Sequence, residues 1–430
     1  MGRPNVKTMD GKTMTTTNNN TGNYKWLLLM FLWAAFFLHQ GTRQIYNAIL
    51  PQIQGAFGVD SLKMGIVGTV FTMTYGICAP LSGLASDFLS RKYMVVAGLF
   101  IFCAGIFVSG WATCIGMMIV FYGLLNGAGQ AFYYPAACSL LSQLHDDTRA
   151  TALSIHQTAL YAGIVICSCV SGYFGDIPSV GDFDGWRMPF VLFGGTGILW
   201  AAVLAVAMRN TKPAQAQGGA AQKASFKDAF FVMFRKPSAI LLAFGMGMHI
   251  YVDCGFKTWM PAFLHDRFAL DGAQAAFNAV IWHYIGACLG VMLGGKVSDY
   301  FAKARKTARF ETNIIGLVLA SPFIFLTANA GAQALCFAAM LAFGFFRGVY
   351  DSNMFASLFD VVAPRYRSAA MGLYLSGAFF LGCPATWALG KVGEHFSLQA
   401  GMAIFAVTYA LGAVAIFLAR GVFYARDKVD

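Results

Sequence analysis

Apolar runs of about 20 residues recur between residues 26 and 420, and they constrain the fold more than any other feature of the chain. A run of that length crosses the hydrocarbon core of a bilayer as a helix, which satisfies its own backbone hydrogen bonds. The composition agrees, with 58% hydrophobic residues, 11% charged residues and a mean hydropathy of +0.60. These values lie outside the range of soluble proteins. The sequence therefore predicts an all-α integral membrane protein.

The apolar runs number about twelve, in two sets of six. Residues 25–208 and 237–420 are each expected to form a six-helix bundle, and 115–141, 332–360 and 367–390 each read as one span. The Gln/Ala/Gly-rich segment 209–236 is expected to be a mobile cytoplasmic linker. Residues 1–24, which are rich in Thr and Asn, are expected to form a disordered tail without a cleavable signal peptide, and residues 421–430 a second cytoplasmic tail.

A short motif occurs once in each half. The second copy lies 212 positions after the first, so that Gly83, Asp87 and Arg91 correspond to Gly295, Asp299 and Lys303. The repeat indicates a duplicated chain and hence two pseudo-symmetric bundles. An Asp one turn before a basic loop suggests a latch to a neighbouring helix end or to an Arg. The alternative is an ordinary polar helix stop.

The distribution of basic residues predicts the topology. With both termini cytoplasmic, 23 of the 30 Lys and Arg residues lie on the cytoplasmic side, four lie outside and three lie within spans. This asymmetry follows the positive-inside rule. We therefore expect a multi-pass protein of the plasma membrane, in a bacterium the inner membrane. The net charge of +11 has the same origin, so no nucleic-acid partner is expected.

The two six-helix halves, the basic linker and the repeated loop motif resemble the major facilitator superfamily over about residues 25–420. The segment Arg149–Ala152 after the fourth helix, echoed by Arg367–Ala370 after the tenth, supports this resemblance. Arg43 followed by Pro51, and the motif GAGQAFYYPA at residues 127–136, resemble the anion:cation symporter and Spinster-like branches.

Those branches often carry an Asp just before the helix-1 Arg and a Glu in the helix-4 motif, where this chain has Thr42 and Gln130. The resemblance implies alternating access, in which two bundles rock about a site near the bilayer midplane. It also implies that Asp87 caps a helix of the opposite half and pairs with Arg91, which holds the outward-open state. The expected gating residues are Gly83, Asp87, Arg91, Gly295 and Asp299.

Charged residues inside spans are the first candidates for a binding site, because each costs at least about 2.5–3.5 kcal/mol to insert. Arg43 lies in the first helix with Tyr46 and Asn47 at i+3 and i+4. Its guanidinium suits a carboxylate or phosphate, which it can bind through two parallel hydrogen bonds. The alternative is an Arg that is neutralised by a neighbouring helix or that snorkels outward.

The second half carries two charged stripes. His249, Asp253 and Lys257 lie four residues apart on the seventh helix, and Arg347 and Asp351 lie four apart on the tenth, with Asn353 beyond. Each pair can neutralise itself as a structural salt bridge. In the functional interpretation, Lys257 or Arg347 holds an anion while Asp253 or Asp351 exchanges a proton, since a poorly hydrated carboxylate takes up protons more readily.

Polar residues of the fourth and fifth helices complete the predicted site. Amides and phenols suit hydroxyl-rich solutes, and Tyr rings offer an apolar face to a sugar ring. The alternative is hydrogen bonding between helices, which is favoured for Asn126. His156 is either a proton site or a structural donor. The candidates are Gln130, Tyr133, Tyr134, His156, Gln157 and Tyr161.

The chain shows no enzyme signature, neither a Walker loop nor a nucleophile with its base outside the membrane. The ten Cys lie mostly within apolar runs without a CxxC pair, so no metal site or cofactor is expected. The leading prediction is a monomeric secondary transporter for a small organic anion, a sugar acid or related carboxylate, driven by protons. The alternatives are a neutral-sugar porter, a drug or lipid efflux carrier, and a membrane sensor of the same fold.

Overall fold

A computed structural model describes residues 19–145, 149–209, 226–363 and 366–429. The helices and strands of the first half are α1 (Asn19–Ala48), α2 (Leu50–Phe57), α3 (Ser61–Phe88), α4 (Arg91–Ser109), α5 (Ile115–Met118), η1 (Ile119–Asn126), α6 (Gly127–Leu144), α7 (Arg149–Asp176), β1 (Ser179–Val180), β2 (Phe183–Asp184), η2 (Gly185–Arg187) and α8 (Met188–Ala207). Those of the second half are α9 (Phe226–Phe234), α10 (Pro237–Phe268), α11 (Gly272–Ala302), α12 (Ala308–Asn329), α13 (Gln333–Asp351), α14 (Met354–Val361), α15 (Arg367–Gly382), α16 (Ala385–His395), α17 (Leu398–Leu418), η5 (Ala419–Phe423) and α18 (Tyr424–Asp427).

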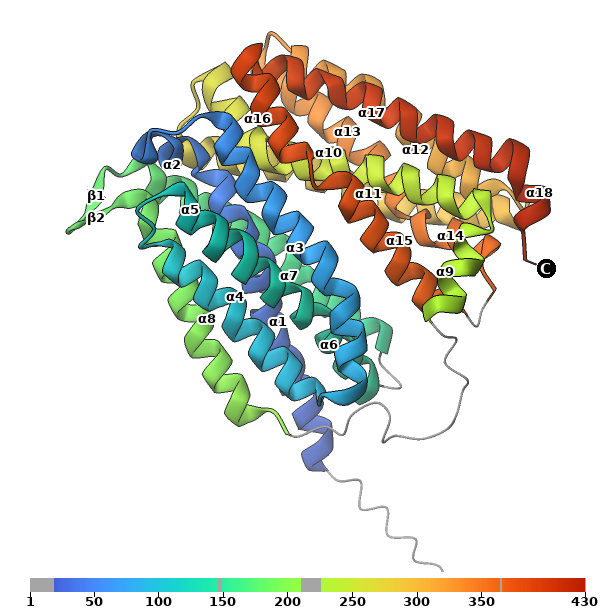
Figure 1. The fold of residues 1–430 in the computed structure, drawn as a ribbon, viewed down its shortest axis with the longest axis horizontal. Helices are drawn as coiled ribbons and strands as arrows, with labels where there is room; N and C mark the ends of the chain where they lie inside the picture. The colour runs from blue at the N-terminus through green and yellow to red at the C-terminus, as the bar shows by residue number, and fades with distance from the viewer. Residues whose placement is uncertain (1–18, 146–148, 210–225, 364–365, 430) are drawn as a thin grey trace, which may run out of the picture.

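The helices form two bundles, α1–α8 and α10–α17, which lie side by side (Figure 1). Eleven helical segments among the described residues are long and apolar enough to cross a membrane. Helix α1, at 30 residues and with an apolar stretch from Trp26 to Leu38, is long enough to be the twelfth. This arrangement confirms the predicted all-α membrane fold of about twelve helices.

The two bundles meet at one end of the molecule, which we call the hairpin end because β1 and β2 pair there as an antiparallel hairpin. They diverge toward the opposite end, which we call the α9 end (Figure 1). Glycines allow the contact at the hairpin end. A Cβ on Gly65 would lie 2.4 Å from the carbonyl oxygen of Thr386, and one on Gly172 would lie 2.3 Å from that of Gly272. Small residues thus bring backbone against backbone.

Polar contacts reinforce this closure. The Asp176 carboxylate, at the end of α7, accepts hydrogen bonds from the backbone N–H groups of Gly272 (2.7 Å) and Ala273 (3.3 Å) at the start of α11. The hydroxyl oxygens of Thr69 and Thr386 lie 2.8 Å apart. A carboxylate from one bundle therefore caps a helix N-terminus of the other, where the unpaired N–H groups and the helix dipole favour negative charge.

Three segments differ from the sequence-based expectation. Helix α1 begins at Asn19, within the predicted tail 1–24. Within 209–236, residues Phe226–Phe234 form α9, because aromatic residues at i and i+4 pack together; the ring centroids of Phe230 and Phe234 are 4.3 Å apart. The predicted tail 421–430 is helical to Asp427, whose carboxylate accepts from the Ser238 N–H (2.9 Å) at the start of α10.

Two predicted spans are interrupted. The helix over 332–360 breaks into α13 and α14 after Asp351. There the Asn353 N–H donates to the Tyr350 carbonyl at 3.1 Å, three residues back instead of the four of an α-helix. The span 367–390 breaks at Cys383 and Pro384, since Pro lacks the N–H that a continuous helix requires. The span 115–141 stays continuous, but residues Ile119–Asn126 adopt the wider π-helix. Short π segments are often found at functional sites.

Candidate functional site

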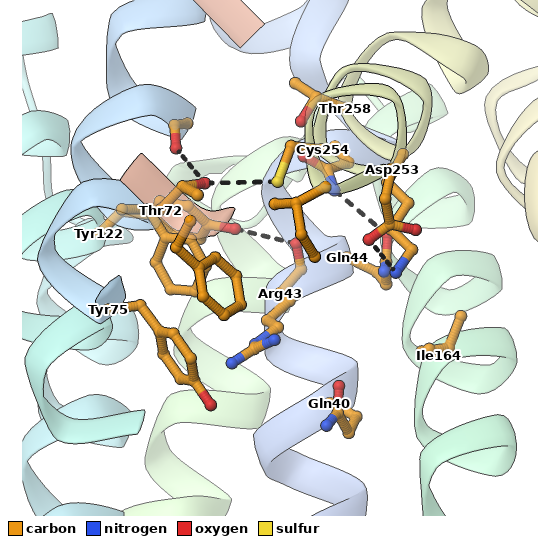
Figure 2. A pocket seen from close by; sticks show the side chains of 16 residues that line it. Gln40, Arg43, Gln44, Thr72, Tyr75, Tyr122, Ile164, Asp253, Cys254 and Thr258 are labelled. Carbon is orange, nitrogen blue, oxygen red and sulfur yellow. Dashed lines mark hydrogen bonds and ion pairs between the residues drawn. The ribbon is translucent and has the colours of Figure 1, made fainter. Parts of the chain in front are cut away.

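A cavity of about 130 Å³ lies between the two bundles. Its walls come from α1, α3, η1 and α7 on one side and from α10 and α15 on the other (Figure 2). The residues that line it are Gln40, Arg43, Gln44, Asn47, Gly68, Phe71, Thr72, Tyr75, Tyr122, Ile164, Ile250, Asp253, Cys254, Lys257, Thr258 and Phe379. The cavity therefore brings together charged residues that lie more than 200 positions apart in the chain.

One face of α1 supplies four of the polar lining residues. Gln40, Arg43, Gln44 and Asn47 fall within an arc of about 100° when each residue turns the helix by about 100°. Tyr46 lies on the other side of Arg43, outside this arc. Its hydroxyl donates to the backbone carbonyl of Met64 at 2.7 Å, and its side chain is fully buried. Of the three residues predicted on this helix, Arg43 and Asn47 face the cavity.

The guanidinium of Arg43 lies beside aromatic rings and an amide. Its Nε donates to the side-chain oxygen of Gln130, and its Cζ is 4.7 Å from the ring centroid of Tyr75 and 5.4 Å from that of Phe71. Figure 2 shows Arg43 and Tyr75 on the α1–α3 side and Asp253 on the α10 side. Among the described residues, no carboxylate lies within ion-pair distance of Arg43, and Nη2 has no hydrogen-bond partner.

Gln130 is fixed by its neighbours. Its amide nitrogen donates to the Asn126 side-chain oxygen at 2.8 Å and to the Thr42 hydroxyl at 3.3 Å. Because Arg43 Nε can only donate a hydrogen bond, the amide oxygen of Gln130 faces Arg43 and its amide nitrogen faces Asn126 and Thr42. The partner of Arg43 is therefore neutral, and the positive charge on Arg43 stays uncompensated in the first bundle.

The second bundle holds a connected charge network. Its centre is Arg347, whose Nη2 lies 2.7 Å from Asp253 Oδ1 and whose Nε lies 3.7 Å from Asp351 Oδ2. The second oxygen of Asp253 binds Lys257 Nζ at 2.8 Å. The sequence placed each acid beside a base on its own helix, and both of those pairs are present. The ion pair between Arg347 and Asp253 additionally joins α13 to α10.

Two histidines and a tyrosine extend this network. Asp351 Oδ1 lies 3.2 Å from His249 Nε2, and His249 Nδ1 lies 3.2 Å from the Tyr409 hydroxyl. His283 Nε2 lies 2.6 Å from Arg347 Nη1. Sequence reasoning missed His283 and Tyr409 as members of the network. The signal for His283 was a polar side chain within an apolar span, but nothing in the sequence pairs it with Arg347.

The remaining predicted residues lie away from the cavity wall. Tyr133 is buried and donates to the Leu32 carbonyl at 3.0 Å, and His156 stacks on Phe36 with centroids 4.3 Å apart. Gln157 and Tyr161 are exposed, and the ring of Tyr161 meets Tyr284 of the other bundle edge to face at 6.1 Å.

Tyr134 and Asn353 also have other contacts. The ring of Tyr134 stacks on Phe36 with centroids 5.2 Å apart. The side-chain oxygen of Asn353 accepts from the Ser298 hydroxyl at 2.8 Å, which ties α11 to the break between α13 and α14.

Three of the predicted gating residues, Arg91, Gly295 and Asp299, do not line the cavity. Of Gly83 and Asp87 the structure describes only their place in helix α3. Arg91 begins α4 and is buried. Gly295 and Asp299 lie near the end of α11, where Asp299 is exposed.

The sequence model described as the Major Facilitator Superfamily matches residues 32–386. The chain belongs to that superfamily. The predicted resemblance is thereby confirmed, and the protein is a multi-pass membrane transporter of the secondary type.

Relatives within the superfamily include the protein spinster of Drosophila melanogaster, which is 22% identical over 87% of this chain and 63% of its own length. A probable hexose phosphate transport protein of Chlamydia trachomatis serovar D is 22% identical over 90% of this chain and 89% of its own. The solved structure of a bacterial homologue of the human lysosomal transporter Spinster, inward-facing and unoccupied, matches with a TM-score of 0.81 and 19% identity. That match covers 95% of this chain and 99% of the homologue.

Proposed function

We propose that the protein carries a small organic anion, a sugar acid or related carboxylate, across the plasma membrane by alternating access and that protons drive this transport. The observation that carries the proposal is the uncompensated Arg43 in the cavity wall. A buried cation without a counter-ion is costly, and a ligand carboxylate that accepts two hydrogen bonds from the guanidinium would remove that cost.

Other lining residues suit the rest of such a solute. Gln40, Gln44 and Asn47 offer amide groups to hydroxyls, and the ring of Tyr75 offers a flat face to a sugar ring. Lys257, across the cavity, offers a second cation. The similarity to a probable hexose phosphate transport protein is in keeping with a negatively charged sugar derivative.

The arrangement of the bundles suits an alternating-access cycle. Closure at the hairpin end leaves the divergent α9 end as the side from which a solute reaches the cavity. With both termini cytoplasmic, as the basic residues predict, this is a cytoplasm-facing state. The similarity to a homologue solved in an inward-facing conformation supports that assignment.

Transport of labelled glucuronate into proteoliposomes tests the proposal, with glucose as the neutral analogue of the same ring. We expect glucuronate to accumulate when the pH gradient is imposed and to equilibrate when an ionophore collapses it, with little entry of glucose. Equal entry of both solutes would overturn the anionic specificity and favour a neutral-sugar porter. Saturable binding of glucuronate without entry would favour a sensor, and extrusion of apolar dyes alone would favour an efflux carrier.

A further inference from the structure

The charge network of the second bundle contains two carboxylates with unlike surroundings. Asp253 contacts a cation with each oxygen, Lys257 at 2.8 Å and Arg347 at 2.7 Å. Asp351 has one distant cation, with 3.7 Å to Arg347 Nε, and its other oxygen faces His249 at 3.2 Å. A proton on Asp253 would weaken two short ion pairs, whereas a proton shared by Asp351 and His249 would weaken one long pair.

The two network histidines also differ in what they can bind. Arg347 has no lone pair and donates from Nη1 to His283 Nε2, so His283 carries its single proton on Nδ1 and stays neutral. His249 faces Asp351 with Nε2 and the Tyr409 hydroxyl with Nδ1. A phenol both donates and accepts, so it can satisfy Nδ1 whether that nitrogen is bare or protonated. His249 can therefore gain a proton without losing either contact.

We infer that the pair formed by His249 and Asp351 is the proton-binding site of this transporter; the inference rests on the proposed proton-driven transport of an anion. In the resting form, His249 carries its single proton on Nε2, which lies beside Asp351, and the Tyr409 hydroxyl donates to Nδ1. One proton from solvent is taken up and held by the pair as a unit: Nδ1 becomes N–H, and the phenol turns to accept it. The Asp351 side chain, 21% exposed against 4% for His249, is the part that solvent reaches.

The groups around His249 make protonation and anion binding cooperative. It is faced by Asp253 and Lys257 of its own helix, by Arg347, Tyr350 and Asp351 of α13, by His283 of α11 and by Tyr409 of α17. A proton on the pair cancels the charge that draws Arg347 toward Asp351. Arg347 then interacts more strongly with Asp253. As a result, the ion pair between Asp253 and Lys257 weakens, and Lys257 becomes free to bind an anion in the cavity. By linkage, anion binding favours protonation to the same extent.

The protonation itself can be tested without any solute. The protein, labelled with ¹⁵N-histidine in lipid nanodiscs, is titrated between about pH 4 and 8, and His249→Gln identifies the His249 signals by difference. We expect His249 to change from a neutral to a doubly protonated ring while His283 stays neutral. In Asp351→Asn the His249 transition should move to lower pH, because the carboxylate that stabilises the cation is gone. A neutral His249 throughout, or an unmoved transition, would overturn the inference.

The transport role is tested with His249→Gln, because the Gln amide can still donate to Asp351 but cannot take up a proton. The control is His395→Gln, at an exposed site on the hairpin end. We expect glucuronate affinity to rise about tenfold from neutral to mildly acidic pH in the wild type and in the control, and to stay constant in His249→Gln. The His249→Gln protein should lose proton-driven accumulation but exchange glucuronate at equal pH.

The two proposals fail in different ways. If the wild type does not transport glucuronate, the proposed substrate is wrong, and the titration still decides whether the pair binds a proton. If the wild type accumulates glucuronate and His249→Gln accumulates it equally well, the proposed function stands and the role of His249 is overturned.

Discussion

In the first bundle, the cation in the cavity wall is Arg43, which donates a hydrogen bond to the neutral amide of Gln130. In the second bundle, two cations and two carboxylates neutralise one another, and Arg347 forms a short ion pair with Asp253 and a longer one with Asp351. Under the proposed function, this difference corresponds to a division of labour between the duplicated halves. The lone cation would bind an external anion, while the balanced network would take up a proton without leaving an unpaired charge in the membrane.

Removal of the lone cation should have the largest effect. Hydrogen bonds to charged groups contribute about 1.5–3 kcal/mol each, so Arg43→Ala should weaken glucuronate binding by more than about 100-fold and abolish uptake. Arg43→Lys keeps the charge but not the planar fork, and it should lose about tenfold. Equilibrium binding measures both. Arg305→Lys, at an exposed arginine, is the control, and unchanged affinity in Arg43→Ala would remove Arg43 from the site.

A carboxylate introduced beside Arg43 would make the first bundle resemble the second. Gln130→Glu nearly preserves the side-chain shape but supplies a counter-ion, so a ligand anion would have to displace it. We expect glucuronate affinity to fall about 10- to 100-fold while the protein remains folded. Gln333→Glu, at an exposed position at the start of α13, controls for added negative charge. Affinity equal to that of the wild type would show that the neutral partner of Arg43 is irrelevant.

Neutralising each carboxylate of the second bundle, Asp351 or Asp253, should affect transport differently. Asp351→Asn should abolish accumulation driven by a pH gradient and retain exchange of labelled glucuronate at equal pH, since exchange requires no net proton movement. Asp253→Asn should bind glucuronate a few-fold more tightly, because Lys257 is released, and this affinity should no longer depend on pH, because Asp253 connects the His249–Asp351 pair to Lys257. If both variants accumulate solute normally, these carboxylates are structural, and His156 becomes the next candidate for the proton.

The repeated loop motif offers a comparison of equivalent residues in the two halves. Asp87→Asn should lower the rate of uptake several-fold with nearly unchanged glucuronate affinity, because a carboxylate near a helix end contributes about 0.3–1 kcal/mol to one conformation only. Asp299→Asn, at an exposed position, should have less effect. Initial rates and binding isotherms distinguish these outcomes. Loss of expression in Asp87→Asn would indicate a structural role instead.

The smallest effect is expected where the bundles touch. Asp176→Asn weakens the cap on α11, which should cost the closed hairpin end about 0.5–1 kcal/mol and shift its population about two- to fivefold. Spin labels at Asp182 and Phe396, with the exposed Cys114 and Cys288 replaced by Ser, report the distance across that end. A distance distribution identical to that of the parent protein would show that the cap does not hold the bundles together.

The sequence allowed the fold, the charged residues and their partners within one helix to be predicted, but not their partners on other helices. Length and hydropathy specify transmembrane helices, and the 212-residue repeat specifies two bundles. Helical spacing alone paired Asp253 with Lys257 and Arg347 with Asp351. It could not pair Arg347 with Asp253 or His283, because such contacts depend on how α10, α11 and α13 pack. For the same reason it could not show that Tyr46 and Tyr133 bond backbone carbonyls away from the cavity.

The π-helical turn η1 makes the first bundle's site depend on the number of residues as well as on their identity. Segment Ile119–Asn126 ends directly before the helix that carries Gln130, and its Tyr122 hydroxyl donates to the Arg43 carbonyl at 2.9 Å. A π-helix takes about one more residue per turn than an α-helix, so deletion of one residue here would restore an ordinary helix and leave Gln130 facing Arg43. Insertion of one residue would instead rotate all that follows by about 100° and turn Gln130 away from Arg43. A single-codon insertion would therefore inactivate this transporter without altering one functional residue.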